Sequence, residues 1–400
     1  MPPGLAKRLS IVAPSVTMKV TALAAELRVR GEDVISLSAG EPDFDTPAHV
    51  KEAAKRALDE GATKYTAVEG MPKLRAAAAA WFARAHGFEV SPDEVMVCAG
   101  AKQAIYNAFH ALLDPGDEVI LPAPCWVSYA EIAKLAGATP VPVLARAEDG
   151  FAIDPNAIAR AVSKATRMIV LCSPSNPTGA VCSEGVLRAL ADLAEFYDLW
   201  LLSDDIYRSL CYGEVRFVQP ATFGPKTRRR TIIVDGVSKS YAMTGWRIGF
   251  CLAPPEVIAG MATLQGQSTT NAAAVSQAAA RAALEGPQED LERMRLAFDE
   301  RRKLMVRALR AIPGVTCVEP QGAFYVFPDV SAFLGKRAPD GRLMDTDVVL
   351  CEHLLRAAQV AVVPGSAFFA PGFVRLSYAA SLESIDKGLS RIAAALADLR

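Results

Sequence analysis

The sequence predicts an α/β protein with a large domain, in which helices enclose a mostly parallel sheet, and a smaller α+β domain built from both termini. Between residues 94 and 253, short apolar runs typical of strands alternate with alanine- and leucine-rich helical runs. Strand, helix and strand in succession favour right-handed crossovers and parallel strands that are covered on both faces. From about residue 291 a long charged helical run replaces this alternation, which indicates a second domain.

The strands of the large domain are expected at a series of apolar runs: EVMVCAG, DEVILPAP, RMIVLCS, WLLSDD, TIIVDG and FCLA. In open sheets of this kind, ligands bind beyond the carboxyl ends of the strands. Gly100, residues 173–179, Asp204 and Lys239 lie at or just past four of these ends. We therefore expect the functional site at this edge of the sheet.

Three segments are expected along the chain: an N-terminal segment at 1–47, a large domain at 48–290 and a small domain at 291–400. The N-terminal segment is rich in turn signals and has little core of its own, so it should pack on the small domain. The small domain should begin with a long helix that ends before Pro313. Further strands are expected in VTCVEP, AFYVFP and FVRLSYA.

Composition narrows the class of protein. The formal net charge is −1, which gives no sign of a nucleic-acid partner. The eight cysteines are scattered without a C-x-x-C pair, and we expect free thiols in a reducing compartment, the cytoplasm. The four histidines show no metal-ligand spacing, so no metal is expected. No apolar run reaches transmembrane length, and no membrane association is expected.

The most informative stretch is SKSYAMTGWRIG at residues 238–249, where Lys239 and Arg247 stand in an otherwise apolar environment. Burying two cations is costly unless each has an anionic or covalent partner. Pyridoxal phosphate supplies both, because its aldehyde condenses with a lysine amine and its phosphate pairs with an arginine. The stretch therefore predicts a pyridoxal-phosphate site. The helix start at Gly100, Ala101 and Lys102 presents free amides to an anion and is a second wall for the phosphate.

Together with Asp204, SPSNPTG and AGEPDF, this stretch resembles the fold type I pyridoxal-phosphate-dependent aminotransferases of class I/II, in particular the bacterial aspartate/prephenate aminotransferase subgroup. The resemblance extends from about residue 27 to residue 379 and implies a sheet of the seven-stranded type. It implies that Lys239 bonds covalently to the cofactor and that Arg247 holds the cofactor phosphate. It also implies that Ser238 binds the cofactor. Asp204 would pair with the pyridinium nitrogen, with Asp205 as its competitor.

The same resemblance implies further cofactor contacts. Asn176 and Tyr207 would hydrogen-bond the phenolic oxygen of the cofactor, and Trp126 would stack on its ring. Tyr65 would reach the phosphate bound by the neighbouring subunit, which makes the protein a two-fold homodimer with shared sites.

On the substrate side, Arg375 in FVRLSYA is expected to clamp the α-carboxylate of an amino acid, with an inter-strand salt bridge as the alternative. Gly40 would allow a close backbone approach, and Trp126 and Asn176 would also face the substrate. In the resembling subgroup a lysine at the position of Lys102 meets a distal carboxylate. A solvated residue at a helix start is the alternative for Lys102.

These residues imply ping-pong transamination, with aspartate and 2-oxoglutarate giving oxaloacetate and glutamate, and with prephenate as a further substrate of some relatives. Three alternatives stay open: an aminotransferase for aromatic, alanine or kynurenine-type substrates, a pyridoxal-phosphate β-lyase, and a non-catalytic regulator. The sequence departs from the family pattern at Asp205, where Glu is usual, and at Asp235, where Asn is common.

Overall fold

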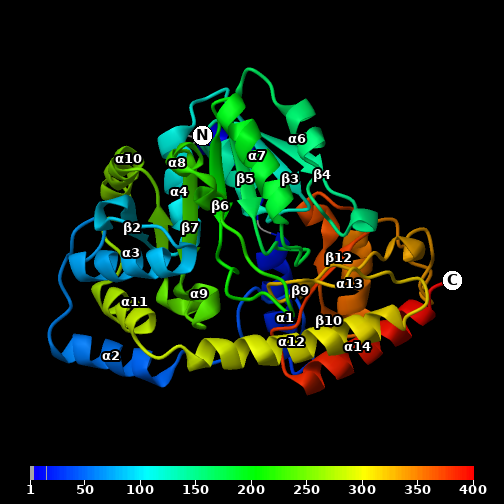
Figure 1. Cartoon of the computed structure of the whole chain (residues 1–400). Coiled ribbons are helices and arrows are strands. Elements are labelled where there is room, and N and C mark those ends of the chain that lie inside the picture. Colours follow the sequence, from blue (N-terminus) through cyan, green and yellow to red (C-terminus); the bar gives the residue numbers. More distant parts are fainter. Residues whose placement is uncertain (1–3, 15) are drawn as a thin grey trace.

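A seven-stranded sheet lies at the centre of the larger half of the molecule (Figure 1). The computed structural model describes residues 4–14 and 16–400, so residues 1–3 and Ser15 of the expected N-terminal segment lie outside the described residues. The strand order is β2-β8-β7-β6-β5-β3-β4. The strands are β2 (Val95–Cys98), β3 (Glu118–Ala123), β4 (Thr139–Leu144), β5 (Thr166–Cys172), β6 (Trp200–Asp204), β7 (Thr231–Gly236) and β8 (Gly249–Leu252). Only β8 runs antiparallel to its neighbours in this sheet, which confirms the predicted α/β fold with a mostly parallel sheet.

Helices cover both faces of the sheet because successive strand residues point to opposite sides. Ile232 and Val234 of β7 pack in one core and Ile233 in the opposite one. The first face is covered by α4 (Ala101–Leu112), α5 (Ser128–Leu135) and α10 (Pro255–Gly266). The second face is covered by α3 (Pro72–His86), α6 (Pro155–Ala161), α7 (Glu184–Phe196) and α11 (Ala274–Glu285). The short helices α8 (Pro225–Arg229) and α9 (Val237–Ser240) flank β7, and α2 (Ala48–Asp59) packs on α11.

Strand β4, which lies at one edge of the sheet, was not predicted from the sequence. Pro140 and Pro142 lie inside this strand and cannot donate to a strand ladder. An edge strand tolerates prolines because one side of its backbone has no partner strand. The two prolines therefore explain both why the sequence did not indicate a strand here and why this strand lies at the edge of the sheet.

The smaller half contains α12 (Glu289–Arg310), α13 (Asp347–Ala357) and α14 (Leu382–Ala397), together with five strands of two to four residues. The strands are β1 (Ile35–Ser36), β9 (Tyr325–Val326), β10 (Val360–Ala361), β11 (Val363–Pro364) and β12 (Val374–Ser377). The order β11-β12-β9 forms an antiparallel sheet, and β1 pairs with β10 in parallel. The prediction of a strand in VTCVEP is wrong. Among the described residues this run contributes only an isolated bridge from Thr316 to Asp329.

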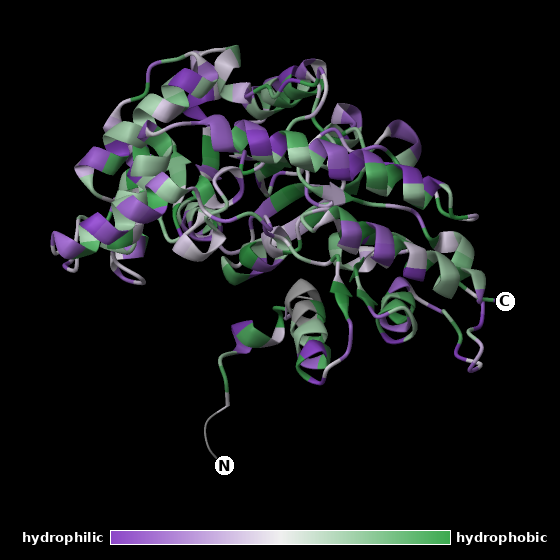
Figure 2. Ribbon diagram, turned by 90° about the horizontal axis from the view of Figure 1, so that it is seen from below, coloured by the Kyte–Doolittle hydropathy of each residue, from purple (hydrophilic) through white to green (hydrophobic). Residues whose placement is uncertain are grey.

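The N-terminal segment lies against the smaller half. Helix α1 (Val16–Val29) supplies Ala24 to a small core that also contains Leu355 of α13 and Ala361 of β10. Figure 2 shows residues 4–14 leading away from α1 toward the N-terminus. Helices α12 and α14 pack against each other on the other side of the smaller half (Figure 1).

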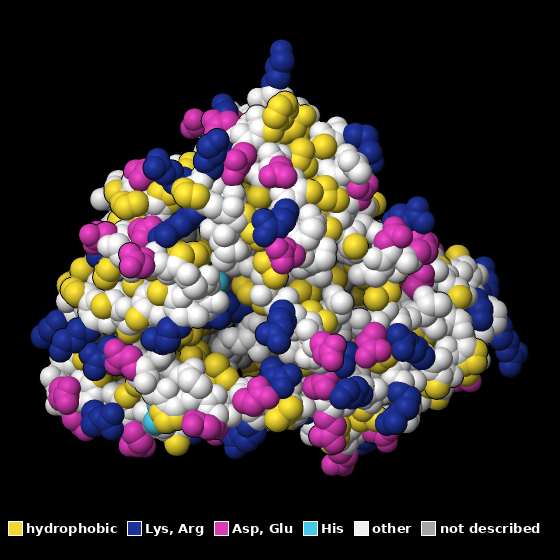
Figure 3. All heavy atoms as spheres, in the orientation of Figure 1, with side chains coloured by type: hydrophobic (Ala, Val, Ile, Leu, Met, Phe, Trp, Pro, Cys, Tyr) yellow, Lys and Arg dark blue, Asp and Glu magenta, His cyan; other side chains and the backbone are white. Residues whose placement is uncertain are grey.

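Positive and negative side chains are mixed over the face drawn in Figure 3, in keeping with the nearly balanced charge. Across residues 4–14 and 16–400, no helix is both long and apolar enough to span a bilayer.

Gly249 at the start of β8 offers a test of the packing that positions α4. A β-carbon at Gly249 would collide with the backbone of Gly100 and Ala101 at the start of α4, whereas one at Gly245 would meet nothing within 4 Å. We expect Gly249→Ala to lower the free energy of unfolding by about 2 kcal/mol or more, because neither backbone has room to retreat. Gly245→Ala is the matched control and should stay within about 0.5 kcal/mol of the wild type in urea unfolding. Equal stability of the two variants would contradict this account.

Candidate active site

A cavity of about 230 Å³ lies beyond the carboxyl ends of β5 and β6 and is lined by residues from both halves of the chain. Eleven of the thirteen predicted site residues line it: Gly40, Ala101, Lys102, Trp126, Asn176, Asp204, Tyr207, Ser238, Lys239, Arg247 and Arg375. Six further residues complete the lining: Ile105, Ser128, Tyr129, Cys172, Ile206 and Tyr325. The fold thus gathers residues that are more than 300 positions apart in the sequence into one site.

Gly100 and Tyr65 are the two predicted residues that do not line the cavity. Gly100 precedes α4 with a φ of 89°, and the Arg247 guanidinium occupies the place of its missing β-carbon. The positive φ favours glycine at this position, and the missing side chain leaves room for Arg247. The Tyr65 side chain is 89% exposed and lies outside the cavity.

Lys239 lies on the single turn of α9, directly after β7. Its Nζ donates a hydrogen bond to the Gly40 carbonyl oxygen at 2.5 Å. Burial lowers the pKa of Lys239 to about 8; the charge of Glu41 opposes this fall, and Arg247 and Arg375 add to it. A larger neutral fraction near physiological pH makes this amine a better nucleophile and base than an exposed lysine.

Asp204 ends β6 and faces the cavity with a buried carboxylate. Its Oδ2 accepts a hydrogen bond from the Tyr129 hydroxyl at 2.5 Å, and its Oδ1 accepts one from the Ile206 amide at 3.3 Å. Burial raises the pKa of Asp204 to about 6, and the two hydrogen bonds work against that rise. A cationic ring nitrogen is the partner that such a carboxylate lacks.

The neighbouring Asp205 points away from the cavity, as strand alternation requires. Its two oxygens accept hydrogen bonds from Ser203 Oγ and Gln219 Nε2, both at 2.6 Å. This geometry favours Asp204 over Asp205 as the carboxylate that meets a ligand.

Arg247 and Lys102 form a cationic wall at the start of α4. Arg247 has a left-handed backbone with a φ of 55°, and its Nη1 donates to the Thr244 carbonyl oxygen at 2.8 Å. Lys102 Nζ lies 4.9 Å from the centroid of the Trp126 ring. Burial lowers the pKa of Lys102, and the charge of Arg247 adds to this effect. The helix start and the two cations together favour bound anions.

Arg375 of β12 is only 2% exposed, yet no carboxylate among the described residues pairs with it. Its Nη1 donates to Asn176 Oδ1 and its Nη2 to the Ser38 carbonyl oxygen, both at 2.9 Å, while the buried Nε has no partner. The structure therefore lacks the inter-strand salt bridge that was the alternative for this arginine. A buried guanidinium without a counter-ion is suited to a carboxylate ligand.

Two tyrosines in the site escaped the sequence analysis. Tyr129 lies three residues after Trp126 in the first turn of α5, and Tyr325 lies on β9 with its hydroxyl 2.8 Å from that of Tyr207. Arg375 Cζ lies 4.4 Å from the Tyr325 ring centroid. The only signal for Tyr129 was its spacing from Trp126, and Tyr325 stands in an apolar run that looks like ordinary core.

The residues present fit pyridoxal phosphate. Lys102, Lys239, Arg247 and Arg375 line the cavity with Asp204 as the carboxylate among them. This set offers an amine for the aldehyde, cations for the phosphate and a carboxylate for the ring nitrogen. Within the described ranges, no cluster of three or more His, Cys, Asp or Glu side chains is arranged to hold a metal ion.

Comparison with known proteins defines the class. Residues 32–392 match the family model for aminotransferase class I and II. The chain is 45% identical to the aspartate aminotransferase of Geobacillus stearothermophilus over 97% of this chain and 98% of that protein. It is 47% identical to the aspartate/prephenate aminotransferase of Cereibacter sphaeroides, over 99% of each chain.

Solved structures agree with this assignment. The crystal structure of the aspartate aminotransferase from Rhizobium meliloti superposes with a TM-score of 0.95 at 45% identity, covering 100% of both chains. The aspartate aminotransferase from Thermus thermophilus with maleate superposes with a TM-score of 0.92 at 46% identity, covering 98% of this chain and all of that one. The chain belongs to the aminotransferase class I and II family. It is an aminotransferase of the aspartate/prephenate subgroup and uses pyridoxal 5′-phosphate as its cofactor.

Asp204→Asn should stabilise the cofactor-free protein at alkaline pH, although it damages the site. The pKa of this carboxyl is about 6 in the folded protein against an ordinary value of 3.8, so above pH 6 its charged form costs about 3 kcal/mol of stability. That cost falls as the pH drops through 6 and is absent below 3.8. We expect the variant to gain up to about 3 kcal/mol in urea unfolding at pH 8 and little at pH 4. Asp149→Asn, at an exposed carboxylate, is the control; a pH-independent loss in Asp204→Asn would contradict the assignment.

Proposed function

We propose that this chain transfers the amino group of aspartate to 2-oxoglutarate, giving oxaloacetate and glutamate. The observation that carries the proposal is the number of cations in the cavity. Lys239 bonds to the cofactor, Arg247 meets its phosphate, and Arg375 meets the α-carboxylate of the substrate. Lys102 is then left for one more anion, and the distal carboxylate of a dicarboxylic substrate provides it. The Thermus thermophilus relative was solved with maleate, which is itself a dicarboxylate.

The positions of the side chains in the cavity support the proposed cofactor contacts. When bound, pyridoxal phosphate supplies an aldehyde for covalent attachment and a ring that accepts the electron pair from the substrate Cα. Asp204, fixed by Tyr129, holds the proton on the ring nitrogen. Asn176, Tyr207 and Trp126 line the same cavity, where the first two would hydrogen-bond the phenolic oxygen and Trp126 would cover one face of the ring.

The phosphate would lie at the start of α4 and beside the turn that carries Lys239. There the backbone of Ala101 and the side chain of Ser238 lie in the same wall as Arg247, which Gly100 admits. Lys102 borders both this wall and the substrate side of the cavity.

The substrate is oriented by its carboxylates. Arg375 grips the α-carboxylate beside the Gly40 backbone, and Lys102 grips the distal one. This leaves the Cα proton to Lys239, whose Nζ, with a pKa near 8, acts as the base that removes and returns it. Aspartate and 2-oxoglutarate both carry two carboxylates, so the same two cations serve both halves of a ping-pong reaction.

Prephenate is a second candidate substrate, because the Cereibacter sphaeroides relative is named for it and prephenate too carries a distal carboxylate.

We also propose a two-fold homodimer in which the exposed Tyr65 reaches the phosphate bound by the partner subunit. The eight free cysteines support a location in the reducing cytoplasm.

Lys239→Ala is the direct test of the site. We expect the purified variant to lose the visible absorbance of the lysine-bound cofactor and to lose turnover by at least about 10⁴-fold, because both depend on the same amine. Spectra and coupled assays with aspartate and 2-oxoglutarate measure the two effects. A coloured and active variant would refute the assignment, and release of ammonia or pyruvate by the wild type would favour a lyase.

Lys102→Ala tests the choice of substrate. We expect kcat/KM for aspartate to fall about 10- to 100-fold, because a charge-assisted hydrogen bond to the distal carboxylate is lost. The half-reaction with alanine, which lacks that carboxylate, should change by less than about threefold. Lys55→Ala, at an exposed lysine, is the control. Unchanged aspartate kinetics would remove the main support for a dicarboxylic substrate.

A further inference from the structure

A buried ion pair lies behind the site without touching the cavity. Arg208 Nε donates to Asp235 Oδ2 at 2.5 Å, and the two side chains are 14% and 0% exposed. The Arg208 guanidinium carbon lies 4.1 Å above the Trp81 ring. Neither charged residue lines the active-site cavity, so the reaction described above does not account for them.

The pair joins the two segments that carry the central groups of the site. Arg208 directly follows Tyr207 in the turn after β6, and its amide donates to the Asp205 carbonyl oxygen at 2.8 Å. Asp235 lies near the end of β7, four residues before Lys239, and its Oδ1 accepts from the Gly236 amide at 2.6 Å. Strands β6 and β7 are parallel neighbours, with Asp204 in register with Val234.

The segment that carries Lys239 needs such a tether. Helix α9 has only four residues, and an isolated turn of helix is not stable by itself. Its entry is held by Gly236, which is paired with Gly249 on β8 and would bring a β-carbon to 3.0 Å from the Gly249 Cα. Asp235 adds the connection to β6 on the other side, so α9 is tied to both neighbouring strands.

We propose that Arg208 and Asp235 are positioning residues, which set the place of the Lys239 amine relative to the Asp204 carboxylate. The inference rests on the proposed roles of Lys239 and Asp204. The pair acts on the reaction through the backbone of two turns, and it neutralises a buried carboxylate one strand away from Asp204.

The charged groups around Arg208 and Asp235 show why the two side chains depend on each other. Burial raises the pKa of Asp235 to about 6, and the adjacent Arg208 opposes the rise. Asp204, Asp205, His86 and Tyr241 are the other titratable groups near Arg208 or Asp235, and the charge of Asp204 adds to the rise in the pKa of Asp235. Buried ion pairs contribute little net stability, but removing one partner leaves an uncompensated charge. A neutral pair of similar shape avoids that penalty.

The test compares Arg208→Gln and Asp235→Asn with the double variant in the cofactor-loaded protein. Each single variant should lower kcat about tenfold with KM within about twofold, because misplaced catalytic groups slow the reaction more than they weaken substrate binding. The pH at which the visible band of the lysine-bound cofactor changes should shift by about 0.5 or more, since this band reports the electrostatic surroundings of Lys239. The double variant should recover at least about threefold in kcat over either single variant, because its two amides can still hydrogen-bond without a lone charge.

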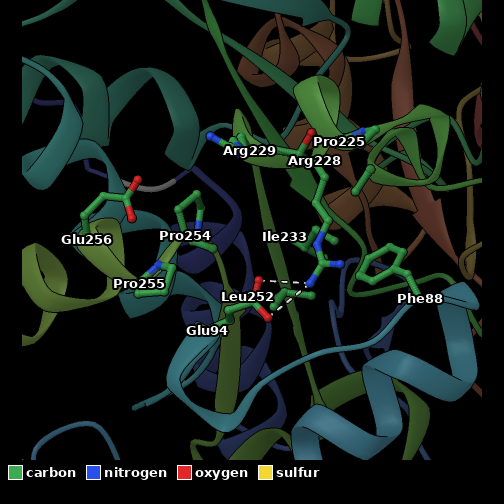
Figure 4. A pocket seen from close by; sticks show the side chains of 13 residues that line it. Phe88, Glu94, Pro225, Arg228, Arg229, Ile233, Leu252, Pro254, Pro255 and Glu256 are labelled. Atoms are coloured by element: carbon green, nitrogen blue, oxygen red, sulfur yellow. Dashed lines mark hydrogen bonds and ion pairs between the residues drawn. The ribbon is translucent and has the colours of Figure 1, made fainter.

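Arg228→Gln is the matched control. Arg228 also pairs with a carboxylate, Glu94 at 2.9 Å, and lies 4.4 Å over an aromatic ring, that of Phe88. Figure 4 shows this pair in a pocket at the other end of β7, beside Ile233 and Leu252. The control should keep the wild-type kcat and spectral pH dependence even where its melting temperature falls.

Single variants that melt earlier but keep kcat and the spectral transition of the wild type would overturn the proposal, as would an equal loss in Arg228→Gln. Should Arg208→Gln fail to fold, Arg208→Lys keeps the charge but lacks the Nε geometry, and a wild-type kcat there would overturn the proposal. Failure of the proposed function is a separate outcome, because the wild type would then lack the lysine-bound band or the aspartate reaction.

Discussion

Positive charge buried between the two halves of the chain is the constraint on which the rest of this structure depends. The half-buried Lys239 comes from the larger half of the chain, where the neighbouring Arg247 side chain is exposed, and the 2%-exposed Arg375 comes from the smaller half. Asp204, buried with them, is held by Tyr129 and Ile206 and not by a cation at hydrogen-bonding distance. Desolvated cations without counter-ions are costly, and only anionic or covalent ligands relieve that cost. An anionic ligand bound in the cavity therefore offsets the cost of desolvating these cations.

The backbone makes room for this charge by close approaches that only glycine permits. The Arg247 guanidinium lies where a β-carbon of Gly100 would be, and Gly249 lets β8 approach the start of α4. The result is a wall of the cavity to which the Arg247 guanidinium and the start of α4 both contribute. Packing and electrostatics are joined here, because any side chain on either glycine would push Arg247 or α4 out of position.

The sequence was most informative where a charged residue stands in a stretch whose pattern is otherwise that of a buried core. Lys239 and Arg247 stand out because they are cations in an apolar stretch, and the central strands stand out because they are buried on both faces. Strand β4 was concealed by its two prolines, and the strands of the smaller half are too short for a period to be read. Tyr129 and Tyr325 resemble ordinary core aromatics until the fold brings them to Asp204 and Tyr207. The pairing of Arg208 with Asp235 depends on two turns meeting in space, which no local pattern records.

Asp204, Asp205 and Asp235 lie at the ends of neighbouring strands, and their different hydrogen-bond partners distinguish them. Asp205 is satisfied by the neutral donors Ser203 and Gln219, and Asp235 is satisfied by Arg208. Asp204 alone of the three lines the cavity, and its donors, Tyr129 and Ile206, leave it without a cationic partner. Under the function proposed above, a protonated ring nitrogen is the cation that this carboxylate binds, whereas Asp205 and Asp235 already have their partners. The hydrogen bonds of Asp205 and Asp235 therefore favour Asp204 for the proposed role as much as its own position does.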